Sequence, residues 1–158
     1  MKGSALSSSP PMTVRQTAHL PLHILLVEDN QDDAFLTQEA FLTLEPTPQF
    51  TVCADGVEAM EYLHGRVQAG QSLPDIILMD LNMPRMDGFG LLEHLKHDPA
   101  LRPVPVLVFS TSNSRSDIRR SYENYANSYI CKPRLFSEYE TVVQAVRSFW
   151  MQTASLPT

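Results

Sequence analysis

Five polar residues stand at or directly after the ends of short apolar runs in the sequence. They are Glu28, Asp29, Asp80, Ser110 and Lys132. Nearly unbroken apolar runs are typical of strands that are buried on both faces, as in parallel sheets. The carboxyl ends of parallel strands meet at one edge of the sheet, and ligands of open α/β folds bind there. We therefore expect the five side chains to share one crevice.

The predicted crevice combines three carboxylates with one hydroxyl and one ammonium group. Two carboxylates about 4 Å apart repel each other by roughly 4 kcal/mol near a protein surface, so three of them favour a bound cation. Ligands that are all oxygen atoms select Mg²⁺ over Zn²⁺. A metal ion, a nucleophilic carboxylate, a cation and a hydroxyl donor are the parts that phosphoryl transfer requires. Asp80 is the expected nucleophile, because it follows the central and most buried run.

Helix caps and turns are the alternative interpretation of these residues. Asp29 or Asn30 could cap the helix after the first run, and Ser110 or Asn113 could cap the helix after the fourth. Each residue taken alone is more often a cap. Five such residues at the ends of the expected strands favour a functional site.

The elements that would position this site alternate regularly along the chain. Five strand-like runs alternate with five segments of helical periodicity, which predicts a parallel sheet with right-handed crossovers. The predicted strands span about residues 22–27, 50–54, 75–79, 104–109 and 128–131. The first predicted helix ends near residue 44. The other four span about residues 57–67, 88–96, 114–125 and 136–151.

Length and composition indicate one ordinary globular domain. The 158 residues are 43% hydrophobic and 19% charged, as in soluble globular proteins. Residues 1–20, rich in Ser, Pro and Thr, are expected to be a flexible tail. The folded domain is expected over residues 21–152, which leaves a short end over 153–158 and no room for an effector domain.

Charge and hydropathy exclude other classes of partner. The formal net charge of −6 argues against nucleic-acid binding, which requires clustered Lys and Arg. No apolar run approaches the roughly 20 residues of a membrane span, and the N-terminal segment does not resemble a signal peptide, so we expect a cytoplasmic protein. Cys53 and Cys131 are expected to be small buried hydrophobes and not a disulfide.

Several motifs together resemble those of bacterial response-regulator receiver domains. They lie at residues 24–30 (ILLVEDN), 55–59 (DGVEA), 80–84 (DLNMP) with 86–88 (MDG), 109–112 (FSTS) and 129–133 (YICKP). The resemblance covers about residues 22–150. It implies the flavodoxin-like, CheY-like fold, a doubly wound parallel sheet of five strands in the order 2-1-3-4-5 with five helices.

The resemblance implies that Asp80 accepts a phosphoryl group from a phosphohistidine on a sensor histidine kinase. Mg²⁺ would be bound by the carboxylates of Asp29 and Asp80 and by the backbone carbonyl of Asn82, while Glu28 holds a metal-bound water. The chain would be no enzyme beyond slow self-dephosphorylation. A phosphorylation-independent binding module is the alternative function. A hydrolase is disfavoured, because Asn82 stands where Asp-based phosphatases carry a second acid.

The resemblance also implies a switch beside the phosphoacceptor. Ser110 would hydrogen-bond the transferred phosphoryl group, Lys132 would pair with it, and Tyr129 would turn inward as Ser110 moves. The Lys132–Pro133 peptide bond would be cis, an isomer found in about 5–6% of X–Pro bonds in folded proteins. The sequence departs from the family where Ser110 replaces a common Thr and where Tyr125 replaces a common Gly.

Further motifs suggest the partners. Residues 36–40, 110–112, 121–122 and 149–150 resemble the small regulators that pair with bacteriophytochromes, which would make a bacteriophytochrome the kinase partner. The apolar stripe of the last helix covers about half of its circumference, more than one face of a sheet usually buries. We therefore expect a homodimer through the last helix and neighbouring elements.

Four residues outside the motifs leave alternatives open. Phe35 and Leu42 lie off the buried stripe of the first helix, and they are either covered by a loop or contact a kinase. His94 and His97 lie three residues apart, as metal ligands sometimes do, but no third ligand is evident. A solvated helix face is the favoured interpretation of the two histidines.

Overall fold

The computed structural model describes residues 21–154 of the chain, and the expected N-terminal tail lies outside them. Five parallel strands form one sheet in the order β2-β1-β3-β4-β5, as predicted. The strands are β1 (His23–Val27), β2 (Gln49–Cys53), β3 (Ile76–Met79), β4 (Val106–Ser110) and β5 (Ser128–Cys131). The α-helices are α2 (Gln31–Ala40), α3 (Gly56–Gln68), α4 (Gly88–His97), α5 (Arg115–Glu123) and α6 (Tyr139–Ala154). Short 3-10 helices, η1 (Phe41–Thr43) and η2 (Phe136–Glu138), follow α2 and precede α6.

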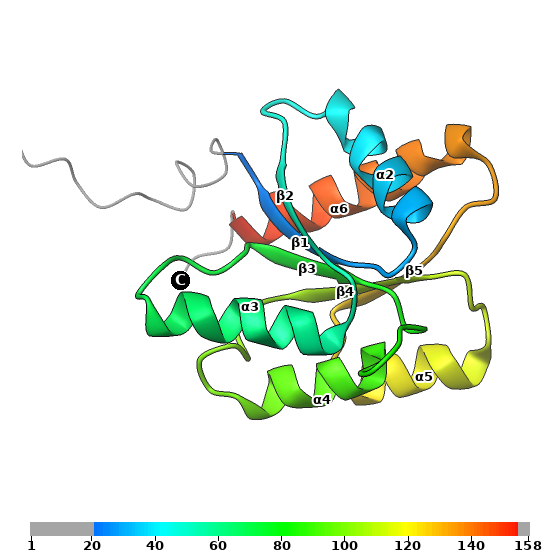
Figure 1. Ribbon diagram of the computed structural model, residues 1–158. Coiled ribbons are helices and arrows are strands. Elements are labelled where there is room, and N and C mark those ends of the chain that lie inside the picture. Colours follow the sequence, from blue (N-terminus) through cyan, green and yellow to red (C-terminus); the bar gives the residue numbers. More distant parts are fainter. Residues whose placement is uncertain (1–20, 155–158) are drawn as a thin grey trace, which may run out of the picture.

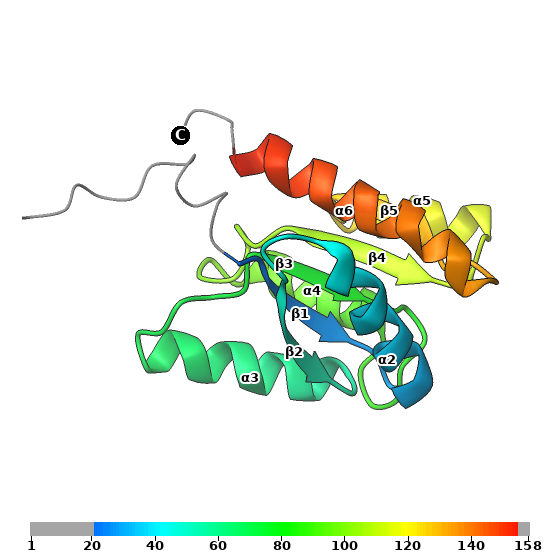
Figure 2. The same cartoon turned by 90° about the horizontal axis from the view of Figure 1, so that it is seen from above.

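The helices form a layer on each face of the sheet (Figures 1 and 2). Helices α2 and α6 cover one face, and α3, α4 and α5 cover the other. The sheet therefore has an apolar core on both sides. Every residue of β3 and β4 is buried, which explains why these strands form continuous apolar runs and not alternating patterns.

Each of four helices begins with a side-chain cap in the loop that follows a strand. Asn30 accepts a hydrogen bond from the Asp33 N–H, and Asp55, Asp87 and Ser114 cap α3, α4 and α5 in the same way. Such caps satisfy backbone N–H groups that have no partner inside the helix. Asn30 is therefore the cap of α2, and Asp29 is left available at the sheet edge.

The last helix differs from its predicted bounds. The predicted start at Phe136 is the 3-10 turn η2, while α6 begins at Tyr139 and continues to Ala154. Tyr139, Val142, Val143 and Val146 are buried against the sheet, whereas 51% of Phe136 is exposed. Part of the apolar stripe predicted for the last helix is therefore buried against the sheet of the same chain. The side chain of Trp150 lies outside the described residues.

Several smaller predictions are corrected or decided. Helix α2 ends at Ala40, four residues before the expected end. Cys53 is buried as expected, but Cys131 is exposed because it closes the edge strand β5; neither forms a disulfide. Phe35 and Leu42 are exposed, so no loop of the described chain covers them. Within residues 21–154, no helix combines the length and apolar composition needed to cross a membrane.

Candidate functional site

Three carboxylates meet at the carboxyl end of the sheet. β1 and β3 are neighbours with Val27 opposite Met79, so Glu28 and Asp80 leave adjacent strands at the same level. The Asp80 N–H donates to the carbonyl oxygen of Val27 at 3.0 Å, which continues the strand pairing up to the site. One carboxylate oxygen each of Glu28, Asp29 and Asp80 lies within 4.8 Å of the other two. The predicted acidic cluster is therefore formed.

Lys132 contacts two carboxylates of this cluster, those of Glu28 and Asp80, and a further carboxylate from α2, that of Asp33. It follows β5 at the sheet edge, and its N–H donates to the carbonyl oxygen of Ser110 at 2.8 Å. Its Nζ donates to Glu28 Oε1, and lies 3.1 Å from both Asp33 Oδ2 and Asp80 Oδ2. Only 3% of the Lys132 side chain is exposed. One ammonium group therefore neutralises part of the charge of three carboxylates.

Burial and charge shift the pKa values of Glu28 and Lys132 in opposite directions. Burial raises the pKa of the Glu28 carboxyl, while the hydrogen bond and the charge of Lys132 oppose that rise. Burial also lowers the pKa of Lys132, but the carboxylates of Glu28 and Asp80 outweigh it and raise the pKa above its ordinary value. Lys132 therefore remains an ammonium ion at neutral pH.

The Asp80 carboxylate is fixed through both of its oxygen atoms. Oδ1 accepts a hydrogen bond from the Leu81 N–H at 2.7 Å, and the Asn82 N–H lies 3.4 Å away. Oδ2 is held by Lys132. A buried carboxylate that is oriented in this way can act as a nucleophile towards a group that enters the crevice.

The residues present fit a hard divalent cation. The three clustered donors are carboxylate oxygens, the ligand type that Mg²⁺ and Mn²⁺ prefer. Asp29 is exposed, so the cluster opens to solvent on one side, where water can complete the coordination of Mg²⁺. Asn82 lies two residues beyond Asp80, also exposed.

Ser110 and Tyr129 are connected at the end of β4. Ser110 is fully buried, and its Oγ accepts a hydrogen bond from the Ser112 N–H at 3.3 Å. The Tyr129 hydroxyl donates to the carbonyl oxygen of Ser112 at 2.7 Å. The two proposed switch residues are therefore linked through one loop residue, while the inward movement of Tyr129 remains a prediction.

The expectation of a cis Lys132–Pro133 peptide bond is wrong for this structure. Among residues 21–154 the cis bond is Glu45–Pro46, and the Lys132–Pro133 bond is trans. The trans isomer is favoured by about 0.5–1 kcal/mol for an X–Pro bond. The Lys132 ammonium group contacts Glu28 and Asp80 while the Lys132–Pro133 bond is trans. The position of Lys132 therefore does not require the rarer isomer.

Sequence reasoning missed Asp33, the third carboxylate on Lys132. It lies in the first turn of α2, where 34% of its side chain is exposed. Its position three residues after the Asn30 cap looks like an ordinary acidic residue at a helix N-terminus. Its contact with Lys132 becomes evident only in the fold, where the side chain of Lys132 crosses the end of the sheet.

The loop after Asp80 is anchored to the loop after β2. Arg85 donates from Nε and Nη2 to the two carboxylate oxygens of Asp55 at 2.7 and 3.2 Å. Arg85 has a φ of +62°, so this ion pair holds a residue in the left-handed region. A Cβ on Gly88 would come within 2.6 Å of the Asp80 carbonyl oxygen, which explains why a glycine stands there. The sequence alone did not suggest the role of Arg85.

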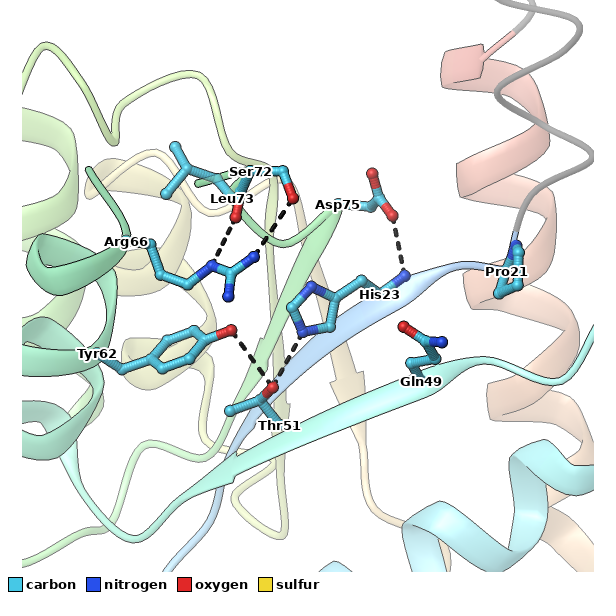
Figure 3. A pocket seen from close by; sticks show the side chains of 9 residues that line it. All are labelled: Pro21, His23, Gln49, Thr51, Tyr62, Arg66, Ser72, Leu73 and Asp75. Atoms are coloured by element: carbon cyan, nitrogen blue, oxygen red, sulfur yellow. Dashed lines mark hydrogen bonds between the residues drawn. The ribbon is translucent and has the colours of Figure 1, made fainter. Parts of the chain in front are cut away.

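Two other groups of polar residues lie apart from this site. His94 and His97 are exposed. Their Nδ1 atoms are hydrogen-bonded to the carbonyl oxygens of Gly90 and Glu93 in the same helix, which fits the predicted solvated face. A cavity of about 490 Å³ lies at the amino end of the sheet, where His23 begins β1 (Figure 3). Its polar side chains mainly bond one another or nearby backbone, in the pairs His23–Thr51, Thr51–Tyr62 and Arg66–Ser72. The five residues of β1 separate it from the acidic cluster by roughly 16–17 Å, at about 3.3 Å per residue.

Comparisons with known proteins agree with this geometry. Residues 24–146 match the response regulator receiver domain family. The chain belongs to this family. It is 40% identical over 131 residues to the probable methanogenesis regulatory protein FilR2 of Methanothrix harundinacea, covering 83% of this chain and 84% of that protein. It is 38% identical over 138 residues to the response regulator Rcp1 of Synechocystis, covering 87% of this receiver and 94% of Rcp1.

Solved receiver structures extend the likeness. The phosphorylated cyanobacterial phytochrome response regulator RcpA has a TM-score of 0.78 and 40% identity, with 88% of this chain and 100% of that chain covered. The Mn²⁺-bound form of Rcp1 has a TM-score of 0.75 and 37% identity, with coverage of 87% and 100%. The receiver is therefore similar to a phytochrome response regulator that was solved phosphorylated and to a response regulator that was solved with a divalent metal.

Proposed function

We propose that this receiver is a Mg²⁺-dependent phosphoacceptor of a two-component system, with Asp80 as the residue that is phosphorylated. The observation that carries the proposal is the position of the Asp80 carboxylate, between the Leu81 N–H and the Lys132 ammonium group. Two further carboxylates, Glu28 and Asp29, lie close enough to share a metal ion with it. A constitutive binding module would not need this arrangement of buried charges.

The proposed reaction is transfer of a phosphoryl group from a phosphohistidine. A carboxylate oxygen of Asp80 forms a bond to phosphorus as the bond from phosphorus to the imidazole nitrogen of the donor breaks, which yields an aspartyl phosphate and a free histidine. Asp29, Asp80 and the backbone carbonyl of Asn82 would hold Mg²⁺, and Glu28 would act through a bound water. The cation supplies charge neutralisation for the phosphoryl oxygens.

The protein's own groups would stabilise the product. Lys132 is already in contact with Asp80, so its ammonium group can pair with the phosphoryl oxygens after a small movement. The Ser110 hydroxyl, at the end of the neighbouring strand β4, would donate a hydrogen bond to the same group. The added charge of roughly −1.5 to −2 would then bias the loop that joins Ser110 to Tyr129. We propose no enzymatic activity beyond slow self-dephosphorylation.

We infer that this receiver is cytoplasmic and that its phosphodonor is a sensor histidine kinase of the bacteriophytochrome class. The similarity to the cyanobacterial phytochrome response regulator RcpA supports this partner. A homodimer through α6 and neighbouring elements also remains a proposal. The exposed apolar side chains of Leu135 and Phe136, which precede α6, support it. Sedimentation that shows only monomers at high concentration, with and without phosphorylation, would remove the dimer.

Phosphotransfer from a purified kinase tests the proposed function. A bacteriophytochrome kinase is first autophosphorylated with radiolabelled ATP, then mixed with this receiver and Mg²⁺. We expect label to move from the kinase to the wild-type receiver, and not to Asp80→Asn. Equal labelling of the variant would refute Asp80 as the acceptor. Transfer from an unrelated histidine kinase at the same rate would refute the pairing with phytochromes.

A further inference from the structure

A cavity of about 720 Å³ opens between the C-terminal ends of α4 and α5. Its walls include the side chains of Lys96, His97, Arg102, Tyr122, Tyr125 and Asn127. Asn127 exchanges hydrogen bonds with Val106, the first residue of β4, so the cavity lies at the amino end of the sheet. Asp80 lies at the opposite, carboxyl end. The volume falls within the roughly 300–1,000 Å³ of small-molecule sites.

Tyr125 occupies a backbone conformation that does not suit a tyrosine. Its φ is +68°, in the left-handed region that residues with a Cβ rarely adopt. Its own packing does not compensate, because 71% of Tyr125 is exposed. The turn that ends α5 accounts for this φ, because the N–H groups of Tyr125 and Ala126 donate to the carbonyl oxygens of Tyr122 and Ser121. That turn does not require an aromatic side chain, so the exposed ring is available to a ligand.

Tyr122 presents a second aromatic ring to the same cavity. Its hydroxyl accepts a hydrogen bond from the Tyr129 N–H at 3.1 Å, which fixes the end of the side chain. About half of the residue, 48%, remains exposed. Two accessible aromatic rings in one concave surface provide stacking faces for a planar ligand.

Two residues of the lining, Lys96 and Arg102, carry positive charge in a chain whose net charge is −6. Lys96 lies in the last turn of α4, where a cation also complements the helix dipole. The dipole does not explain Arg102, which lies beyond the helix, is exposed, and makes no guanidinium hydrogen bond within residues 21–154. Lys96 Nζ donates to the carbonyl oxygens of Arg102 and Val104, at 3.2 and 3.4 Å. Its third proton has no acceptor in the described part of the chain.

We propose that this cavity binds a mononucleotide, with its base stacked against Tyr122 and Tyr125 and its phosphate paired with Arg102 and Lys96. The ligand class follows from the two halves of the lining. Aromatic rings favour a planar base, and cationic groups favour an attached anion. An inorganic anion would not use the tyrosines, and an uncharged aromatic molecule would not use the cations.

Titration of the ¹⁵N-labelled full chain with AMP, followed by NMR, tests the proposal. Inorganic phosphate and adenosine are titrated separately, and no divalent metal is added, so that the acidic cluster does not recruit phosphate. We expect saturable shifts at Arg102, Tyr125 and Asn127, and tighter binding of AMP than of either fragment. Absence of saturable shifts at millimolar AMP, or equal binding of phosphate alone, would overturn the proposal.

Matched variants separate binding from folding. Tyr125→Gly should weaken AMP binding by about fivefold or more, as expected for loss of a base–aromatic stack, yet raise the melting temperature because glycine accepts a positive φ. Arg102→Gln should weaken binding by a similar factor, whereas Arg115→Gln, an exposed arginine at the other end of α5, should not. Equal losses for the two arginine variants would refute the site.

Two further measurements separate this cavity from the phosphoacceptor site and from a protein-binding surface. Asp80→Asn should bind AMP as the wild type does, so the cavity and the phosphoacceptor site can fail independently. Saturable shifts at the same residues with a glutamate-rich peptide, but not with AMP, would assign the cavity to a protein partner and overturn the nucleotide.

Discussion

Replacement of Lys132 by methionine would remove the ammonium group that three carboxylates share. A charge pair 3.1 Å apart, the distance from Lys132 Nζ to Asp80 Oδ2, attracts by about 5 kcal/mol at an effective dielectric constant of about 20. The desolvation of the ions offsets much of this attraction in the intact protein. Removal of one partner leaves the buried Glu28 and Asp80 uncompensated, which typically costs about 3–5 kcal/mol. Total stabilities are only about 5–15 kcal/mol, so the loss is large.

Urea unfolding of wild type, Lys132→Met and Lys96→Met, each without and with saturating Mg²⁺, measures the effect. Lys96→Met is the matched control, because Lys96 Nζ bonds backbone carbonyl oxygens and has no carboxylate partner among residues 21–154. We expect it to lose about 1 kcal/mol. Mg²⁺ should stabilise Lys132→Met more than wild type, because the cation replaces the missing positive charge.

Two results would refute this reasoning. A loss of less than about 1 kcal/mol for Lys132→Met would mean that the carboxylates do not depend on the ammonium group. An equal stabilisation of wild type and variant by Mg²⁺ would mean that the metal ion and Lys132 do not act on the same charges.

Two further predictions concern the residues around the cluster. Asp33→Asn should lower the free energy of unfolding by no more than about 1 kcal/mol, since the pair with Lys132 is partly exposed; Asp32→Asn, in the same helical turn, should lose less, and equal losses would contradict a role for the ion pair. The Arg85 guanidinium lowers the pKa of Asp55, so this carboxylate stabilises the fold above its unfolded pKa, and the contribution is lost as the pH falls through its folded pKa. Unfolding curves of Arg85→Gln and wild type should therefore differ at neutral pH and converge in acid; a difference that persists in acid would contradict this.

The sheet could be predicted because its central strands are buried on both faces. Such strands leave continuous apolar runs such as residues 24–27, and the polar residues after them then fall at one edge of the sheet. Strand order and the joint position of Glu28, Asp80 and Lys132 followed from this alternation and from the family resemblance. These features could be predicted because each depends on residues that are close in sequence or that belong to a family motif.

The features that could not be predicted depend on contacts between distant segments. Asp33 and Lys132 are 99 residues apart in sequence, so no spacing indicates their ion pair. The exposure of Cys131 depends on the position of β5 at the sheet edge. The trans Lys132–Pro133 bond shows the limit of resemblance, because a family feature was assigned to a position where this structure does not have it.

The most direct test of the central claim is the intact mass of the protein after incubation with Mg²⁺ and the small phosphodonor acetyl phosphate. Wild type should gain the mass of one phosphoryl group, and this gain should be lost when EDTA removes the metal ion. Asp80→Asn should gain none, although it keeps the hydrogen-bonding shape of the side chain. No gain in wild type, or the same gain in Asp80→Asn, would contradict the assignment of Asp80 as the phosphoacceptor.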